Sequence, residues 1–154
     1  MSVSLLGAAP IGAIMRLSYK QLISEHDDIA LIADRLLSSL AHETPSVMLS
    51  HLAELARLVR SHMQNECRAL AEVDPDRLGG PWQAAWGRGM ADFRKLQADW
   101  IMYLQTWDEH AITAGRKDFA YATELMLPRL RARMAIENEA LYAAALQTSA
   151  IALA

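Results

Sequence analysis

The residues of this sequence with the clearest chemical potential are His62 and Glu66. They are four residues apart, so on a helix they share one face at a distance of about 6 Å. That face also carries an apolar stripe: Met48, Leu52, Leu55, Val59, Ala69, Leu70 and Val73. A histidine and a carboxylate on a buried stripe can hold a metal ion inside a helical bundle. They can equally form a buried polar network without a metal, and the pair alone does not choose between these.

The composition indicates one all-helical domain. The chain has 154 residues, of which 53% are hydrophobic, including eight methionines. This length is enough to bury roughly 70% of the surface of the unfolded chain, and sparse β-branched residues favour helix throughout. The net charge is −3 and no basic run stands out, so no nucleic-acid partner is predicted.

Cysteine usage and the chain ends suggest where the protein works. Cys67 is the single cysteine, which excludes an internal disulfide and fits a reducing compartment; we interpret it as a buried structural thiol. Segment 1–16 is apolar but lacks an early Lys or Arg and contains Pro10, so we interpret it as an N-terminal arm rather than a signal peptide. We predict a cytoplasmic protein without a membrane partner. The apolar arm and the tail, 149–154, would favour a homodimer.

Four long helices are expected in the domain, residues 17–148. Ser18 and Thr44 are expected N-caps, Pro45 following Thr44 at the first helical position. Asp118 is the expected N-cap of the last helix, and Pro128 should kink that helix or interrupt one hydrogen bond. The expected helices are 18–41, 45–72, 81–107 and 118–148.

Each helix has one apolar stripe, and three stripes contain polar residues. His26 lies in the first stripe, His62 and Glu66 in the second, and Arg133 and Glu137 in the fourth. The third stripe instead carries large rings at a spacing of seven, which we interpret as a seam facing the core: Trp86, Phe93, Trp100 and Trp107.

The short loops predict an up-down-up-down antiparallel four-helix bundle. Counting residues along such helices places the five polar stripe residues near one end of the bundle. The same count places Trp100 toward the opposite end.

Three of these segments resemble the motifs of the hemerythrin-like (HHE cation-binding) domain family. Ser24 to Ile29 resembles the family's Glu-His-x-x-Ile, and His62 to Glu66 resembles its His-x-x-x-Glu. Ile136 to Tyr142 resembles its Glu-Asn-x-x-Leu-Tyr signature. The three motifs occur in the family's order, and the resemblance covers most of residues 18–146. It implies a hemerythrin-like bundle with iron bound between the helices.

Two departures from the family pattern imply that only part of the site remains. The family has a histidine four residues before its last glutamate, where this chain has Arg133. Its third helix carries a Glu-His, which we align with Asp99-Trp100. The resemblance therefore implies a half-site, meaning the ligands of one metal ion plus both bridging carboxylates: His26, His62, Glu66 and Glu137.

Arg133 changes the chemistry expected of this half-site. Two carboxylates in an apolar bundle need nearby positive charge to stay ionised. A guanidinium offers only donors and cannot bind a metal, but it can form a forked ion pair with Glu66 or Glu137. We therefore expect Arg133 to act as a fixed cation in place of the second metal.

Three functions remain open. The first is a cation-binding or sensing domain that holds at most one metal ion, iron or zinc, and does not carry dioxygen as a di-iron centre. The second is a metal-free bundle that serves as a dimeric interaction module or binds a small ligand. The third, an iron-dependent redox enzyme, is disfavoured because the ligands of the second iron are missing, and no other catalytic set stands out.

Overall fold

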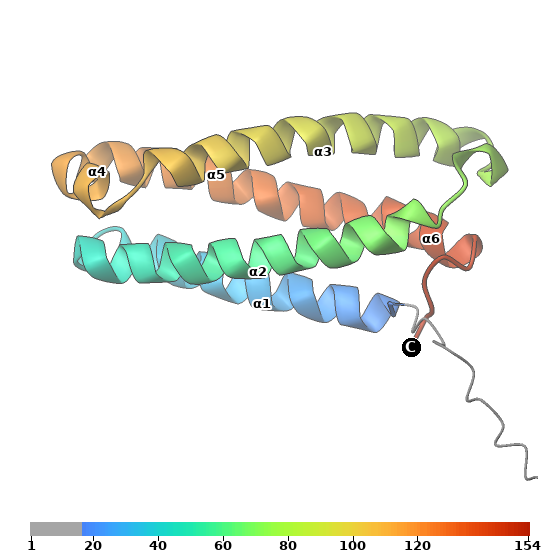
Figure 1. Ribbon diagram of the computed structural model, residues 1–154, viewed down its shortest axis with the longest axis horizontal. Helices are drawn as coiled ribbons and strands as arrows, with labels where there is room; N and C mark the ends of the chain where they lie inside the picture. Colours follow the sequence, from blue (N-terminus) through green and yellow to red (C-terminus); the bar gives the residue numbers. More distant parts are fainter. Residues whose placement is uncertain (1–16) are drawn as a thin grey trace, which may run out of the picture.

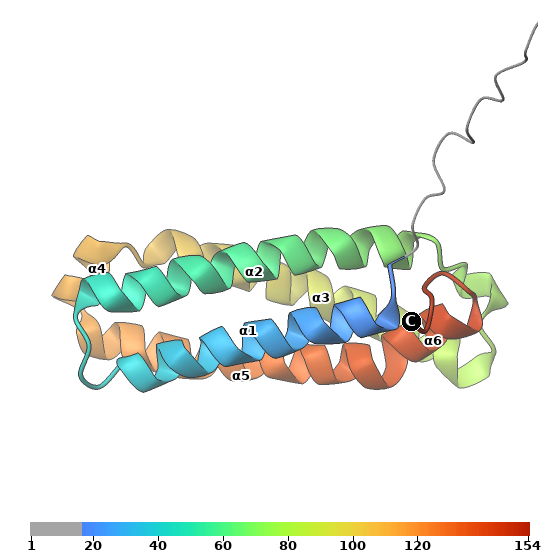
Figure 2. The same ribbon diagram turned by 90° about the horizontal axis from the view of Figure 1, so that it is seen from below.

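The computed structural model describes residues 17–154, and the expected N-terminal arm, 1–16, lies outside them. The described chain is all-α. Its four long helices lie lengthwise beside one another as a bundle (Figures 1 and 2). They are α1 (Tyr19–Ser39), α2 (Pro45–Ala71), α3 (Gly80–Thr106) and α5 (Arg116–Ile136). The shorter elements are the 3₁₀ turn η1 (Pro75–Arg77), α4 (Glu109–Ala114), the π-helical turn η2 (Glu137–Leu141) and α6 (Tyr142–Gln147).

Side-chain caps start the first two helices as the sequence predicts. The Ser18 side chain accepts a hydrogen bond from the Gln21 amide, and Thr44 does the same for the Val47 amide. These bonds satisfy amides that have no partner within the helix. Pro45 then occupies the first turn of α2.

The start of the last long helix differs from the prediction. Asp118 is not its N-cap, because α5 already begins at Arg116 after Gly115. The connection before it contains the short helix α4, which the sequence reading missed. Asp108 starts α4 by accepting a hydrogen bond from the Ala111 amide, and α5 continues through Pro128.

The core is divided by a layer of polar side chains. On one side lies the apolar cluster that we call the ring cluster, which includes Leu36, Leu55, Trp100, Tyr103 and Phe119. On the other side lies a smaller cluster that includes Leu22, Leu70, Trp86 and Leu141. The polar layer falls between them on each helix that contributes to it, and its members are His26, His62, Glu66, Arg133 and Glu137.

The C-terminal tail packs on the start of α1. Ala152 forms a β-bridge with Ser18, and the Ala152 carbonyl accepts a hydrogen bond from the Tyr19 amide at 2.7 Å. Ile151 is buried in the smaller cluster, whereas Leu153 is 70% exposed. Within residues 17–154, no helix combines the length and the apolar character needed to cross a membrane.

Candidate metal centre

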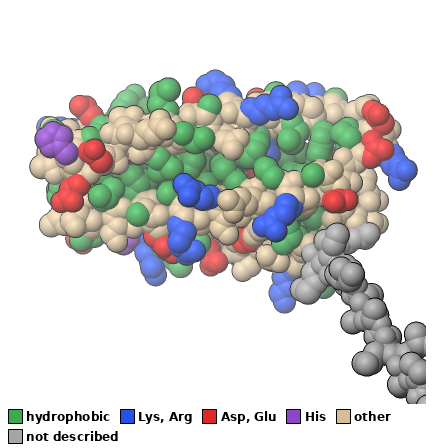
Figure 3. Space-filling view, viewed as in Figure 1, with side chains coloured by type: hydrophobic (Ala, Val, Ile, Leu, Met, Phe, Trp, Pro, Cys, Tyr) green, Lys and Arg blue, Asp and Glu red, His purple; other side chains and the backbone are tan. Residues whose placement is uncertain are grey.

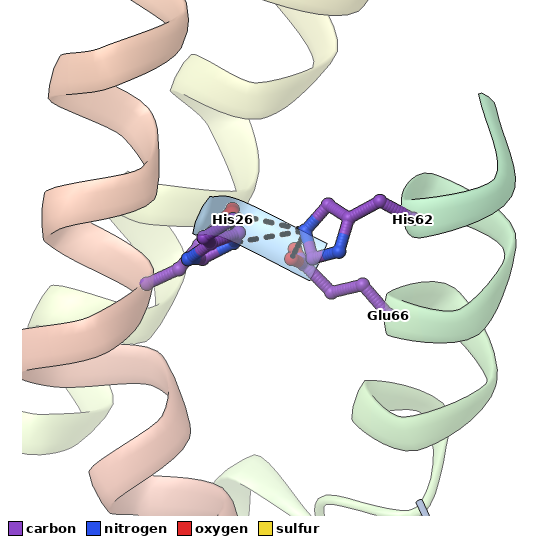
Figure 4. A group of neighbouring side chains, drawn as sticks. His26, His62 and Glu66 are labelled. Carbon is purple, nitrogen blue, oxygen red and sulfur yellow. Dashed lines mark hydrogen bonds and ion pairs between the residues drawn. The ribbon is translucent and has the colours of Figure 1, made fainter. Parts of the chain in front are cut away.

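The polar layer brings together the four residues that were expected to form the half-site. His26 comes from α1, His62 and Glu66 from α2, and Glu137 from the turn η2. All four are buried, and one ligand atom of each lies within 4.8 Å of the others. Figure 4 shows His26 facing His62 and Glu66 across the interior of the bundle.

The spacing of the ligand atoms fits a single small cation. His26 Nε2 lies 3.0 Å from His62 Nε2 and 3.1 Å from Glu137 Oε1. His62 Nε2 lies 2.9 Å from Glu66 Oε2. Ligand atoms about 2.1 Å from a shared metal ion are about 3.0–3.4 Å from their neighbours. The residues present could therefore hold one metal ion through nitrogen and oxygen ligands, although not every pair of ligand atoms is this close.

Hydrogen bonds behind the histidines fix which ring nitrogen faces the centre. His62 Nδ1 lies 2.7 Å from Glu25 Oε2, and a carboxylate only accepts, so this Nδ1 carries the proton and donates. The other Glu25 oxygen accepts from Asn65 Nδ2 at 2.7 Å. His26 Nδ1 donates to Asn138 Oδ1 at 2.8 Å. Such partners orient metal-binding histidines and leave Nε2 for the ion.

Arg133 stands beside both carboxylates, as expected of a fixed cation. Its Nε donates to Glu137 Oε2 at 2.8 Å, and its Nη2 lies 3.5 Å from Glu66 Oε1. Its Nη1 donates to the Gly89 carbonyl at 2.6 Å, and the Phe93 ring lies 4.8 Å from the guanidinium carbon. The side chain is only 7% exposed, so its charge acts on the carboxylates with little screening by water.

Burial and hydrogen bonding shift the pKa values of both carboxylates and of His62. Burial opposes ionisation of Glu137, but hydrogen bonds from His26 and His62 and the Arg133 charge hold the pKa of Glu137 well below its usual range. Burial and the nearby charge of Glu137 raise the pKa of Glu66, although the hydrogen bond from His62 opposes this shift. Burial also disfavours the charged form of His62, yet its hydrogen bonds to Glu137 and Glu66 win and raise the pKa of His62 to about 10. In the metal-free protein, Arg133 and protonated His62 thus offset the buried carboxylates.

Tyr142 is a member of this centre that the sequence reading missed. Its hydroxyl donates to Glu66 Oε2 at 2.8 Å and lies 3.1 Å from His26 Nε2. Burial and the nearby carboxylates raise the pKa of Tyr142, so it stays a neutral donor.

The π-helical turn explains why helical spacing did not reveal Tyr142. Tyr142 is five positions after Glu137, which would place the two side chains about 140° apart around an α-helix. In η2 the Tyr142 amide instead bonds to the Glu137 carbonyl five residues earlier. This wider turn puts both side chains into the polar layer. The only available signal was the family signature, which contains a tyrosine at this position.

Trp100 does not belong to the centre. It stacks on Tyr103, with ring centroids 5.5 Å apart, in the ring cluster. The residues of α3 that contact Arg133 are Gly89 and Phe93, about two to three helical turns earlier. Asp99 instead pairs at the surface with Lys95 and Arg129.

The remaining candidate ligands lie elsewhere. His42 and His110 are exposed, His51 is half-buried, and none belongs to the buried group. Tyr103 lies in the ring cluster, where its hydroxyl shares a hydrogen bond with Thr123 Oγ1 at 2.6 Å. Cys67 is exposed on α2, so its interpretation as a buried thiol was wrong.

None of the family models, characterised proteins or solved structures compared with this chain matches it. The fold and the site therefore define a class only in structural terms: an all-α bundle with a buried histidine and glutamate group that could hold a metal ion.

Proposed function

We propose that this protein binds one metal ion, iron or zinc, through His26, His62, Glu66 and Glu137. One observation carries the proposal. Both histidines are held from behind by oxygen acceptors. Their Nε2 atoms lie 3.0 Å from each other, and each is 2.9–3.1 Å from one of the two carboxylates. A purely structural network has no need to aim two imidazole nitrogens at one point.

We further propose that the chain is a hemerythrin-like domain with an up-down-up-down antiparallel arrangement of its four long helices. The three sequence motifs support this, because their histidines and glutamates are the residues that meet in the polar layer. In this proposal Arg133 occupies the place of a second metal ion, and its bonds to Glu137 and proximity to Glu66 support that role.

Binding or sensing suits such a centre better than turnover. A bound divalent ion would supply a Lewis-acidic positive charge where the metal-free protein holds the proton of His62. Arg133 neutralises one carboxylate permanently and cannot open a coordination position. The protein's own residues therefore provide a charge-balanced pocket for one ion.

Metal content tests this proposal directly. The full chain, purified without a His-tag or chelator, is incubated with iron(II) or zinc, desalted and analysed for metal. We expect about one ion per chain, and loss of that ion in His62→Ala. His51→Ala is the matched control, because His51 is on the same helix but outside the buried group. Equal metal retention in His62→Ala and in the parent protein would contradict the proposal.

A metal-free bundle that binds a small ligand or a second copy is the second candidate. It is favoured by the ion pairs themselves, because Arg133 and His62 already offset Glu66 and Glu137 without a metal. Its signature is a protein that retains no added metal and has the same melting temperature with and without chelator. A metal-dependent rise in melting temperature would instead favour the first candidate.

A further inference from the structure

A cavity of about 320 Å³ lies beside the polar layer, between the C-terminal part of α2 and the N-terminal half of α3. Its walls are apolar, and Cys67, which is exposed, lies on its rim. Figure 3 shows hydrophobic side chains gathered along the middle of the face between these two helices. The residues that form the walls are Leu70, Val73, Trp86, Met90 and Phe93.

The inner side of this cavity is polar. Glu66 and Arg133 both line it. Nη2 of Arg133 is buried and has no hydrogen-bond partner, although Nε and Nη1 are both bonded. A buried donor without a partner is costly, and native proteins rarely leave one. Nη2 lies 3.5 Å from Glu66 Oε1 without a hydrogen bond to it, so an acceptor atom that reached Nη2 from the cavity would supply the missing bond.

The charges around the cavity select the class of ligand. Arg133 is bonded to Glu137 and lies 3.5 Å from Glu66, so two carboxylates already offset its charge. An anionic ligand would meet Glu66 as well as Arg133, whereas a neutral acceptor avoids that repulsion. The volume is at the lower end of the range for small-molecule sites, which is about 300–1,000 Å³.

We propose that this cavity binds a small neutral molecule with an apolar, ring-sized body and one carbonyl or similar oxygen, which accepts a hydrogen bond from Arg133 Nη2. The apolar body packs among Val73, Trp86, Met90 and Phe93. This site shares Glu66 and Arg133 with the proposed metal centre, but it uses neither histidine and needs no bound ion.

Cys67 provides the readout, because it is the only cysteine of the chain and lies on the rim. The rate of its alkylation by iodoacetamide is measured in the metal-free full-length protein at increasing concentrations of acetophenone, and calorimetry gives the affinity. We expect saturable protection of Cys67 and a submillimolar dissociation constant. Ethylbenzene, which has a similar body without the oxygen, should bind about ten-fold more weakly. Benzoate should also bind more weakly than acetophenone.

Two variants on one helix locate the binding. Met90→Trp fills the cavity and should abolish protection, whereas Met102→Trp adds the same ring at a position that is 67% exposed and should leave it unchanged. Absence of saturable protection in the parent protein, or equal losses in the two variants, would overturn the site. Equal binding of ethylbenzene would overturn the role of Arg133, and tighter binding of benzoate would overturn the neutral ligand class. Metal content is measured on the same samples, so failure of the metal proposal is visible separately.

Discussion

The ring cluster and the polar layer are adjacent parts of one core, but they bury different chemistry. In the ring cluster, Trp100, Tyr103 and Phe119 stack with centroids 5.5–6.4 Å apart. Its buried tyrosine, Tyr103, shares a hydrogen bond with the neutral hydroxyl of Thr123. In the polar layer, two histidines, two glutamates, one arginine and Tyr142 share a network of hydrogen bonds.

The comparison distinguishes the part of the core that stabilises the fold from the part that could bind a ligand. Apolar stacking of the first kind stabilises a fold through burial and ring contacts. Buried ion pairs recover little more than their desolvation cost, and well-packed apolar residues of similar volume often serve stability as well or better. We therefore attribute the stability of the fold to the ring cluster, whereas the polar layer is the part of the core that the proposed metal binding would use.

The largest expected effect comes from removing the fixed cation. Arg133→Ala leaves Glu66 and Glu137 buried without their cation, so the free energy of unfolding should fall by about 3–5 kcal/mol. Phe119→Ala in the ring cluster should lose a similar amount, about 3–5 kcal/mol, through a cavity. Urea denaturation measures both.

A second substitution distinguishes the two losses. Glu137→Gln removes a charge that Arg133→Ala leaves unpaired, so combining them should recover part of the stability lost in Arg133→Ala. Combining Glu137→Gln with Phe119→Ala should give no such recovery. Arg131→Ala, which removes an exposed ion pair with Asp34, should cost less than about 1 kcal/mol. If Arg133→Ala unfolds no more easily than Arg131→Ala, the fixed-cation role is wrong.

The polar layer should also make the stability of the protein depend on pH. We expect this effect to be smaller than that of Arg133→Ala. The pKa of His62 is about 10 in the folded protein against an ordinary value of 6.5. Its contribution is fully present below pH 6.5 and is lost as the pH rises toward 10. Glu137 has a lowered pKa, so its contribution is lost as the pH falls below its ordinary value of 4.5. The groups that face His62 are Glu25, His26, Glu66, Glu137 and Tyr142.

Burial raises the pKa of Glu66, so its contribution is lost as the pH rises above its ordinary value of 4.5. The metal-free protein should therefore be most stable near pH 4.5. From pH 6.5 to 10, its free energy of unfolding should fall by an amount on the order of a few kcal/mol. His62→Gln is the control, since it keeps the size of the side chain without the titration. Urea denaturation at pH 6, 8 and 10 compares the two proteins. Parallel declines in both would show that His62 is not the group responsible.

The sequence predicted the ring cluster and the polar layer with different success. Helical spacing alone predicted the apolar stripes. Arg133 and Glu137, which it placed in the fourth stripe, are both buried. It also gave the side-chain caps at Ser18 and Thr44.

Spacing along one helix could not predict how far neighbouring helices are shifted along the bundle. It also could not predict a local change from α-helix to π-helix. The position of Gly89 and Phe93 opposite Arg133 depends on how far α3 is shifted along the bundle, which the loop before it sets. Tyr142 enters the layer only because η2 is wound more widely than an α-helix. Glu25 and Asn65 were visible in the motifs, but their role depends on the contact between α1 and α2.

The two buried tyrosines allow a closely matched comparison of the polar layer with the ring cluster. The expected difference in stability is the smallest of those proposed. Tyr142 donates to a carboxylate, whereas Tyr103 bonds to a neutral hydroxyl. Hydrogen bonds to charged groups contribute about 1.5–3 kcal/mol and neutral ones about 0.5–1.5 kcal/mol. Tyr142→Phe should therefore destabilise the metal-free protein more than Tyr103→Phe, by about 1 kcal/mol in urea denaturation at pH 6. Equal losses would mean that the Tyr142 hydroxyl contributes no charge-assisted bond, and that Glu66 relies on His62 and Arg133 alone.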